Sequence, residues 1–231
     1  MNFDLEVLMF TASVWLLPLL IAITFHEAAH GYVALKLGDK TALLNGRVSF
    51  NPARHLDPFG TIILPGLLLM GSSGKMMFGY AKPVPVNFMC LRYPRRDMIL
   101  VALAGPAVNV ILAFFSALLV HFLVYLPENI VEWAALNLSN SIYLNLILAI
   151  FNMIPLPPLD GGRVAIGLLP RPFAKSLARM ERFGFLIILV GVIVLPWIGE
   201  MLSLNLQIFS WLVAEPASLL YTYLLQLTGV I

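Results

Sequence analysis

The residues of this sequence best suited to chemistry are His26, Glu27 and His30, which form an H-E-x-x-H motif. Residues four apart lie on one face of a helix, so the two histidines can offer imidazole nitrogens to a single metal ion. Two neutral imidazoles suit Zn²⁺, and a neighbouring carboxylate can take a proton from water at the metal. The spacing therefore predicts metal-assisted hydrolysis with Glu27 as the base. The alternative is that the two histidines only form hydrogen bonds to neighbouring helices.

The motif lies inside an apolar run from about Leu8 to Leu35, which is long enough to cross a bilayer. Ionisable groups at membrane depth are costly and are usually retained for a function, which favours the metal site over the structural alternative. Lys36, Lys40, Arg47 and Arg54 follow the run. Because Lys and Arg accumulate on the cytoplasmic side, we expect the N-terminus outside and the active site toward the cytoplasm.

The composition is that of a polytopic membrane protein. Of the 231 residues, 60% are hydrophobic and only 11% are charged, which is too little polar surface for a soluble globule. The net charge is +2 and the basic residues lie between apolar runs, so we expect a lipid bilayer and no nucleic acid as partner. Cys90 is the single cysteine, which excludes a cysteine-based zinc site. The metal must then use histidine and carboxylate ligands.

We expect an all-α polytopic membrane fold with about five transmembrane helices in a single domain, residues 1–231. The expected spans are about 7–37, 98–126, 141–154, 183–198 and 204–227, with a catalytic core at about 8–163 and C-terminal helices at about 183–228. Phe59–Met70 is apolar but short, and Pro65 and Gly66 interrupt it. We therefore interpret it as a re-entrant segment, with a true span as the alternative.

Two stretches predict a small β-sheet at the membrane surface. Thr41–Phe50 contains Asn45-Gly46, a hairpin signal between β-prone pieces. Met76–Asn87 could pair with it, although Pro83 and Pro85 confine that part to an edge. An edge strand near the metal site could bind an extended polypeptide by strand addition.

A catalytic zinc needs a third protein ligand and an open position for water, and the candidate is Asp160. It follows the third expected span and, by the distribution of basic residues, lies on the same side as His26 and His30. Prolines end the helix just before it, and Gly161-Gly162 allow close approach to a neighbouring helix. From spacing alone, a simple polar turn is an equal alternative for this segment.

The chain resembles the site-2 proteases, a family of intramembrane zinc metalloproteases. The resemblance rests on the H-E-x-x-H motif together with Asn152–Arg163 (Asn-Met-Ile-Pro-Leu-Pro-Pro-Leu-Asp-Gly-Gly-Arg), and it extends to Gly105-Pro106 and Asn109 of the second span. It implies one Zn²⁺ per chain, held by the two histidines of the motif and Asp160, with the motif glutamate as general base.

The resemblance also implies that Asn152 helps to hold the substrate or the developing oxyanion, a role that suits an amide donor beside a metal. The alternative for Asn152 is a hydrogen bond between helices. Asn109, in the apolar second span, is a further candidate neighbour of the active site.

The chain is expected to be a compact bacterial-type member of this family, without a span before the H-E-x-x-H helix and without a PDZ or CBS module. It also has an insertion at about residues 50–96, where Asn51–Thr61 resembles a segment of one bacterial subgroup. His55 and Asp57 in this insertion are candidate active-site neighbours, and His55 could contact the metal. The alternative for both residues is a turn with local hydrogen bonds.

The leading hypothesis is a multi-pass protein of a bacterial cell membrane that cleaves membrane-spanning proteins within or near the bilayer, as in regulated intramembrane proteolysis. Such a site needs a polar cavity open to the cytoplasm, and the substrate helix must unwind to expose a peptide bond. A membrane metal-ion transporter is the alternative from another class, because His and Asp clusters also line ion paths. A non-proteolytic scaffold is a third. The candidate ligands are concentrated at one depth on one side, which favours the enzyme. The sequence does not indicate an oligomeric state.

Overall fold

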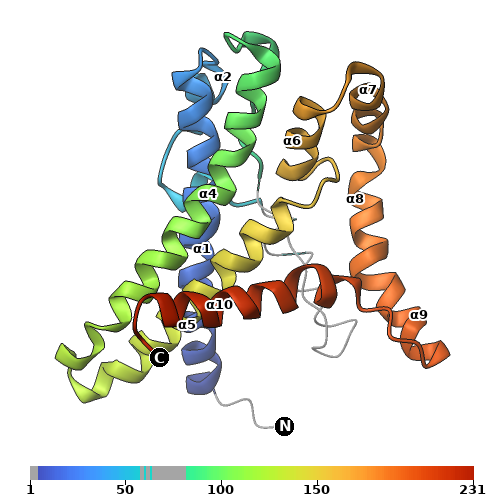
Figure 1. Ribbon diagram of the computed structural model, residues 1–231. Helices are drawn as coiled ribbons and strands as arrows, with labels where there is room; N and C mark the ends of the chain where they lie inside the picture. The colour runs from blue at the N-terminus through green and yellow to red at the C-terminus, as the bar shows by residue number, and fades with distance from the viewer. Residues whose placement is uncertain (1–4, 58–59, 61–62, 64–81) are drawn as a thin grey trace.

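Four helices of this protein are long and apolar enough to cross a membrane, among the residues that the structure describes. The structure is a computed structural model that describes residues 5–57, 60, 63 and 82–231. Three of the four are the single helices α1 (Leu5–Lys36), α4 (Pro94–Val120) and α5 (Glu128–Asn152), and the fourth runs from α8 (Glu181–Leu189) through η5 (Val190–Val194) into α9 (Leu195–Leu202). Figure 1 shows these helices running along the length of the molecule, with α5 ending about halfway. The prediction of an all-α membrane fold is confirmed for the described residues.

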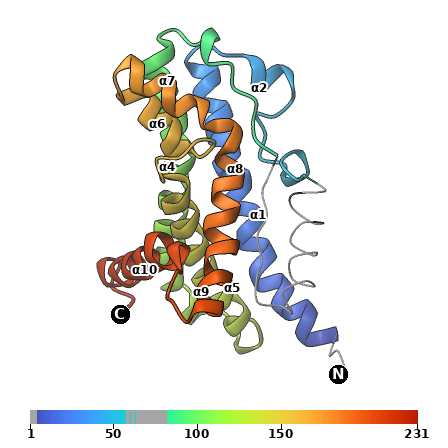
Figure 2. The same ribbon diagram turned by 90° about the vertical axis from the view of Figure 1, so that its right-hand side faces the viewer.

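The fifth predicted span, at about 204–227, is not among the candidate spans. Its helical part is η6 (Ser210–Ala214) continued by α10 (Glu215–Leu227), which lies across the long helices in Figures 1 and 2. Glu215 and several hydroxyl side chains lower the hydropathy of this stretch, so it is less apolar than the four spans. The prediction of about five spans is therefore corrected to four within the part of the chain that the structure describes.

The predicted β-sheet is not found, because the described residues contain no strand. Thr41–Leu44 forms the short helix α2 instead, and Asn45 is its C-cap. Gly46 follows with φ +64°, a conformation typical of the residue that ends a helix. Asn45-Gly46 therefore ends a helix where a hairpin was predicted.

The second predicted β-prone stretch and the re-entrant segment fall largely outside the described residues. Met76–Ala81 lies outside them, while Lys82–Asn87 is described and belongs to no strand. Phe59–Met70 also lies outside them, apart from Gly60 and Ile63. The two flanks of the undescribed part meet, since the backbone N–H of Lys82 donates to the carbonyl of His55 at 3.0 Å.

The core of the bundle is built on α4, which packs against both α1 and α5. Small residues on α4 let the neighbouring helices approach closely, as is common where helices pack in membranes. One apolar cluster joins α4, α5 and α10. Its buried members are Ala113, Ala117, Ile142, Leu146, Ala217 and Leu225.

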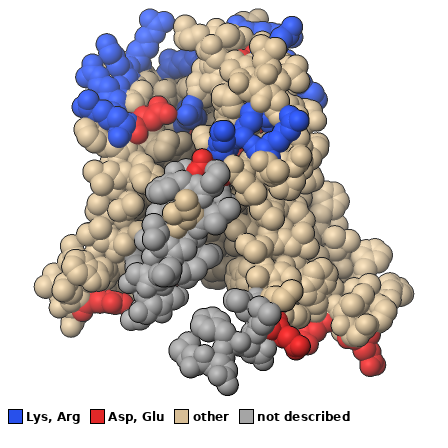
Figure 3. Space-filling view, turned by 180° about the vertical axis from the view of Figure 1, so that it is seen from behind, with Lys and Arg blue, Asp and Glu red and all other residues tan. Residues whose placement is uncertain are grey.

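Short helices complete the basic end of the molecule. They are α2, η1 (Pro52–Arg54), η3 (Phe88–Cys90), α6 (Asp160–Leu168) and α7 (Arg171–Arg179), while η4 (Leu123–Tyr125) lies at the turn between α4 and α5. Figure 3 shows Lys and Arg gathered at this end of the visible face, with acidic side chains at the opposite end. The acidic end includes Glu6 near the start of α1 and Glu128 at the start of α5.

Candidate metal centre

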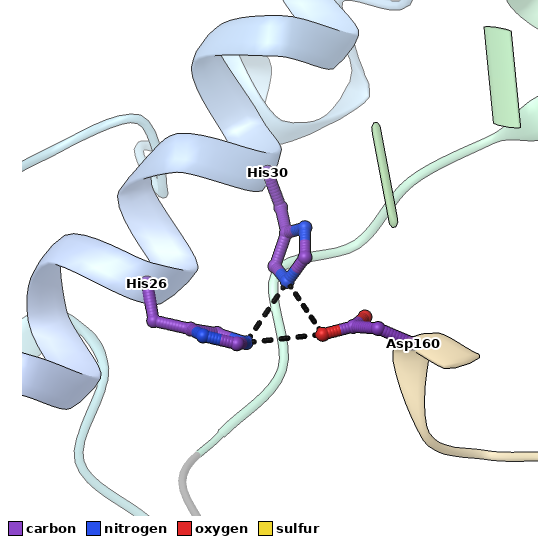
Figure 4. A group of neighbouring side chains, drawn as sticks. All are labelled: His26, His30 and Asp160. Atoms are coloured by element: carbon purple, nitrogen blue, oxygen red, sulfur yellow. Dashed lines mark hydrogen bonds and ion pairs between the residues drawn. The ribbon is translucent and has the colours of Figure 1, made fainter. Parts of the chain in front are cut away.

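His26, His30 and Asp160 converge at one point between α1 and α6 (Figure 4). Oδ2 of Asp160 lies 3.2 Å from Nε2 of His26 and 3.3 Å from Nε2 of His30, and the two Nε2 atoms are 3.1 Å apart. The two imidazoles are buried, with 7% and 8% of their residue surface exposed. The structure therefore brings together the three residues that the sequence marked as candidate ligands.

The spacing of these three atoms fits a tetrahedral zinc ion. Zinc bonds of about 2.0–2.2 Å place the ligand atoms of a tetrahedral site about 3.3–3.5 Å apart. The observed separations of 3.1–3.3 Å are close to this range. The donor set of two imidazole nitrogens and one carboxylate oxygen is also one that zinc uses when it keeps an open position for water.

The remaining ring nitrogens of the two histidines are held by α4, which fixes the orientation of each imidazole. Nδ1 of His26 lies 2.5 Å from Oδ1 of Asn109, and Nδ1 of His30 lies 2.7 Å from the carbonyl of Val101. Because both partners are acceptors, each Nδ1 carries the proton and each Nε2 has a lone pair for a metal. Asn109, expected near the site, thus contacts His26 directly.

Asn109 is held in turn by Asn145 of α5. Its Nδ2 donates to Oδ1 of Asn145 at 2.7 Å, and Nδ2 of Asn145 donates to the carbonyl of Ser141 at 2.8 Å. Both asparagines are fully buried. Sequence reasoning missed Asn145, although a buried amide in an apolar span is a signal of the same kind as Asn109.

Gly105 of α4 provides the space that the two imidazoles occupy. A Cβ atom at this position would lie 2.5 Å from Nε2 of His30 and 2.6 Å from Nε2 of His26. No side chain larger than hydrogen therefore fits there without moving the histidines. The sequence pointed to Gly105 through the family resemblance, and the structure shows that it contacts both candidate ligands.

Asp160 is positioned by the way the chain leaves α5. The helix ends at Asn152, and the loop that follows contains a cis peptide bond between Pro157 and Pro158. Asp160 is then the first residue of α6. Arg95 of α4 donates from Nε to the carbonyl of Gly167 at 2.9 Å and from its terminal nitrogen to that of Leu169, which ties α6 to α4.

The carboxyl of Asp160 favours its ionised form in this setting. Burial raises the pKa of Asp160, but the adjacent ring nitrogens of His26 and His30 outweigh that effect and hold the pKa below its usual range. An ionised carboxylate is the form that binds a metal.

A cavity of about 770 Å³ opens beside the three candidate ligands. Glu27 and Asn152 line it together with mostly apolar residues of α5, α8 and the segment Lys82–Asn87. Oε2 of Glu27 accepts the backbone N–H of Val84 at 2.7 Å, and Nδ2 of Asn152 donates to the carbonyl of Leu148 at 2.9 Å. Both candidate catalytic side chains thus share one cavity with the metal centre.

His55 and Asp57 are not brought into this centre. His55 is buried with its Nε2 2.7 Å from the carbonyl of Ser49, and Oδ1 of Asp57 accepts the N–H of Gly60 at 2.7 Å. Among the described residues, neither belongs to the metal-binding group or to the cavity lining. The local hydrogen bonds agree with the turn alternative for this pair.

The family model for peptidase family M50 matches residues 14–132 and 125–195 of the chain. The chain is 43% identical over 178 residues to a Bacillus subtilis protein named "Putative zinc metalloprotease YwhC", covering 75% of this chain and 77% of that protein. It is 30% identical over 171 residues to a Mycobacterium tuberculosis protein named "Putative zinc metalloprotease Rip2", covering 74% of this chain and 63% of that protein. No solved structure matches the chain.

These matches show that the chain belongs to peptidase family M50, the site-2 protease family. The resemblance inferred from the two motifs is confirmed. Together with the four apolar helices, it makes the chain a multi-pass membrane metalloprotease.

Proposed function

We propose that this metalloprotease is an intramembrane zinc endopeptidase in which His26, His30 and Asp160 hold one Zn²⁺. The observation that carries the proposal is the triangle of two Nε2 atoms and Oδ2, with sides of 3.1–3.3 Å, beside a cavity between apolar helices. The names of the relatives support zinc as the metal.

Glu27 and Asn152 supply the groups that peptide hydrolysis needs beside the metal. A zinc ion held by the three proposed ligands would supply the activation of water and the polarisation of the peptide carbonyl. The carboxylate of Glu27 accepts the proton of the attacking water and passes it to the leaving amine. The amide of Asn152 lies in the same cavity, where the amide hydrogen that is not bonded to Leu148 orients the substrate or stabilises the oxyanion.

The substrate class is a membrane-spanning protein that has unwound at the cleavage site. The two ligands of the metal centre on α1 lie ten and six residues before Lys36, which is roughly 9–15 Å along a helix from the basic end. A peptide bond is accessible at this depth only if the substrate helix opens, because a helix in lipid keeps its backbone groups paired internally. The cavity volume of about 770 Å³ is enough for several extended residues.

The active site faces the cytoplasm in this proposal, in a bacterial cell membrane. The support is the gathering of Lys and Arg at the end of the molecule nearer to the metal centre (Figure 3). The catalytic core is assigned to about residues 8–163, with residues 50–96 as an insertion and residues 183–228 as C-terminal helices.

The substitution Glu27→Gln tests the proposal, because it removes the base and leaves the three ligands. Purified wild type and Glu27→Gln should each hold about one zinc per chain, and only the wild type should cleave a fluorescence-quenched casein, which is already unwound. In cells, membrane-spanning proteins should accumulate uncut when Glu27→Gln replaces the wild type.

Glu128→Gln is the matched control, since Glu128 lies exposed at the opposite end of the molecule. It should cleave casein at the wild-type rate. Cleavage by Glu27→Gln at the wild-type rate would refute the assigned base. Metal-dependent ion transport without any cleavage would favour the transporter instead.

A further inference from the structure

Residues Lys82–Asn87, here called the strap, form one wall of the cavity and are fixed to the protein at both ends. At one end, a terminal nitrogen of Arg47 donates to the carbonyls of Lys82 at 2.5 Å and Pro83 at 3.3 Å. At the other end, Oδ2 of Asp39 accepts the backbone N–H of Asn87 at 2.7 Å. Asp39 is fully buried and Arg47 is 8% exposed. Burying two charged side chains costs free energy. That both of them bond the backbone of the strap indicates that the protein keeps the strap in a defined position.

Within its Pro83-Val84-Pro85 sequence, the strap has a single backbone donor. Pro83 and Pro85 have no N–H, so Val84 carries the one amide hydrogen of the Pro-Val-Pro sequence. A residue that precedes proline is also restricted to extended conformations, which limits the directions in which the Val84 amide can point. The sequence thus presents one donor in a narrow range of directions.

That single donor bonds the proposed general base. The Val84 N–H lies 2.7 Å from Oε2 of Glu27, which leaves Oε1 free of this contact. The strap packs against α1 near Gly31, one turn after Glu27. A Cβ at Gly31 would lie 3.2 Å from a methyl carbon of Val48 and 3.4 Å from one of Val84.

We propose that the strap is a positioning device for Glu27, in which the Val84 amide orients the carboxylate and Arg47 and Asp39 hold that amide in place. The proposal rests on the proposed role of Glu27 as general base. A carboxylate on a flexible side chain can rotate away from the reacting water, and a hydrogen bond to one oxygen fixes the direction of the other. Arg47 and Asp39 act through the strap and are positioning residues only.

Val84→Pro tests the donor directly, because it deletes the amide hydrogen and places a ring carbon against Oε2 of Glu27. With quenched casein as the probe, kcat should fall about 10- to 100-fold while KM changes less than threefold and the zinc content stays at the wild-type value. Val84→Ala keeps the N–H and should retain kcat within threefold.

The split between kcat and KM in Val84→Pro distinguishes a misdirected carboxylate from a damaged substrate wall. A rise in KM with unchanged kcat in Val84→Pro would show that the strap is only a wall for the substrate. Loss of zinc from Val84→Pro, or an equal loss of kcat in Val84→Ala, would also overturn the proposal.

Arg47→Met tests the anchor. It should lower kcat at least threefold with zinc retained, because the carbonyls that fix the strap lose their donor. Arg54→Met is its control, since exposed Arg54 bonds only the nearby carbonyl of Gly46 among the described residues. If Glu27→Gln is inactive while Val84→Pro and Arg47→Met keep full kcat, the positioning role fails and the proposed function stands. If Glu27→Gln cleaves casein, both fail.

Discussion

Gly105→Ala should weaken metal binding strongly by adding a single methyl group. The added carbon would lie 2.5 Å from Nε2 of His30, which is about 0.9 Å short of the 3.4 Å at which ordinary contact begins, and 2.6 Å from Nε2 of His26. A metal site tolerates errors of only about 0.2 Å in its ligand distances. The histidines cannot give way by 0.9 Å and keep the triangle, so zinc affinity should fall at least about 100-fold, or roughly 2.7 kcal/mol.

The assay is competition for zinc between the purified protein and a chelator of known affinity. Gly191→Ala is the matched control, because a Cβ at Gly191 meets nothing within 4 Å in the described structure. It adds the same methyl group to another apolar helix and should leave zinc affinity unchanged. Equal zinc affinity in Gly105→Ala and the wild type would refute the placement of the metal between these two imidazoles.

Two further predictions concern the support of the site and its orientation. Asn145→Leu removes the acceptor that holds Asn109, so chelator competition should show about tenfold weaker zinc binding. Asn137→Leu is the control and should leave zinc binding unchanged, because among the described residues the amide of Asn137 bonds only Trp133 of its own helix. An unchanged affinity in Asn145→Leu would remove that residue from the support of His26. In a Cys90→Ser background, single cysteines at residues 54, 82 and 175 should be labelled from the cytoplasm and one at residue 128 from outside. Labelling of residues 54 and 82 from opposite sides would show that Phe59–Met70 spans the membrane.

The candidate ligands could be identified from sequence because each has a local signal. His26 and His30 share a helix face by their spacing, and Asp160 follows prolines that must end a helix. For Asp160 to reach the two histidines, α5 must end on the same side of the molecule as the second half of α1, which carries them. Their role as zinc ligands remains a prediction.

The contacts that support the ligands could not be predicted in the same way, because they depend on which residues meet between helices. Nothing local to Gly105 shows that two imidazoles fill the space beside it. Nothing local to Val84 shows that its amide meets Glu27, which lies 57 residues away along the chain. Both contacts depend on the packing of α1 against α4 and the strap.

The two errors in the fold have local causes. Asn45-Gly46 was interpreted as a hairpin turn, but the same dipeptide ends a helix when glycine follows the C-cap with positive φ. Here Asp39 favours the helix, since its Oδ1 accepts the N–H of Thr41 at 2.9 Å. The fifth span was inferred from apolar length alone, which does not distinguish a crossing helix from one that lies across the bundle, as α10 does (Figure 2).

X-ray absorption at the zinc edge of the purified protein tests the central claim most directly. The proposed site predicts two imidazole nitrogens and at least one oxygen at about 2.0–2.2 Å, with no sulfur. In Asp160→Ala the imidazole contribution should remain at two while zinc affinity falls. A spectrum with three or more imidazoles would require His55 or His121, the other two histidines of the chain, as a zinc ligand and would contradict the assignment. An Asp160→Ala protein with the wild-type spectrum and affinity would contradict it equally.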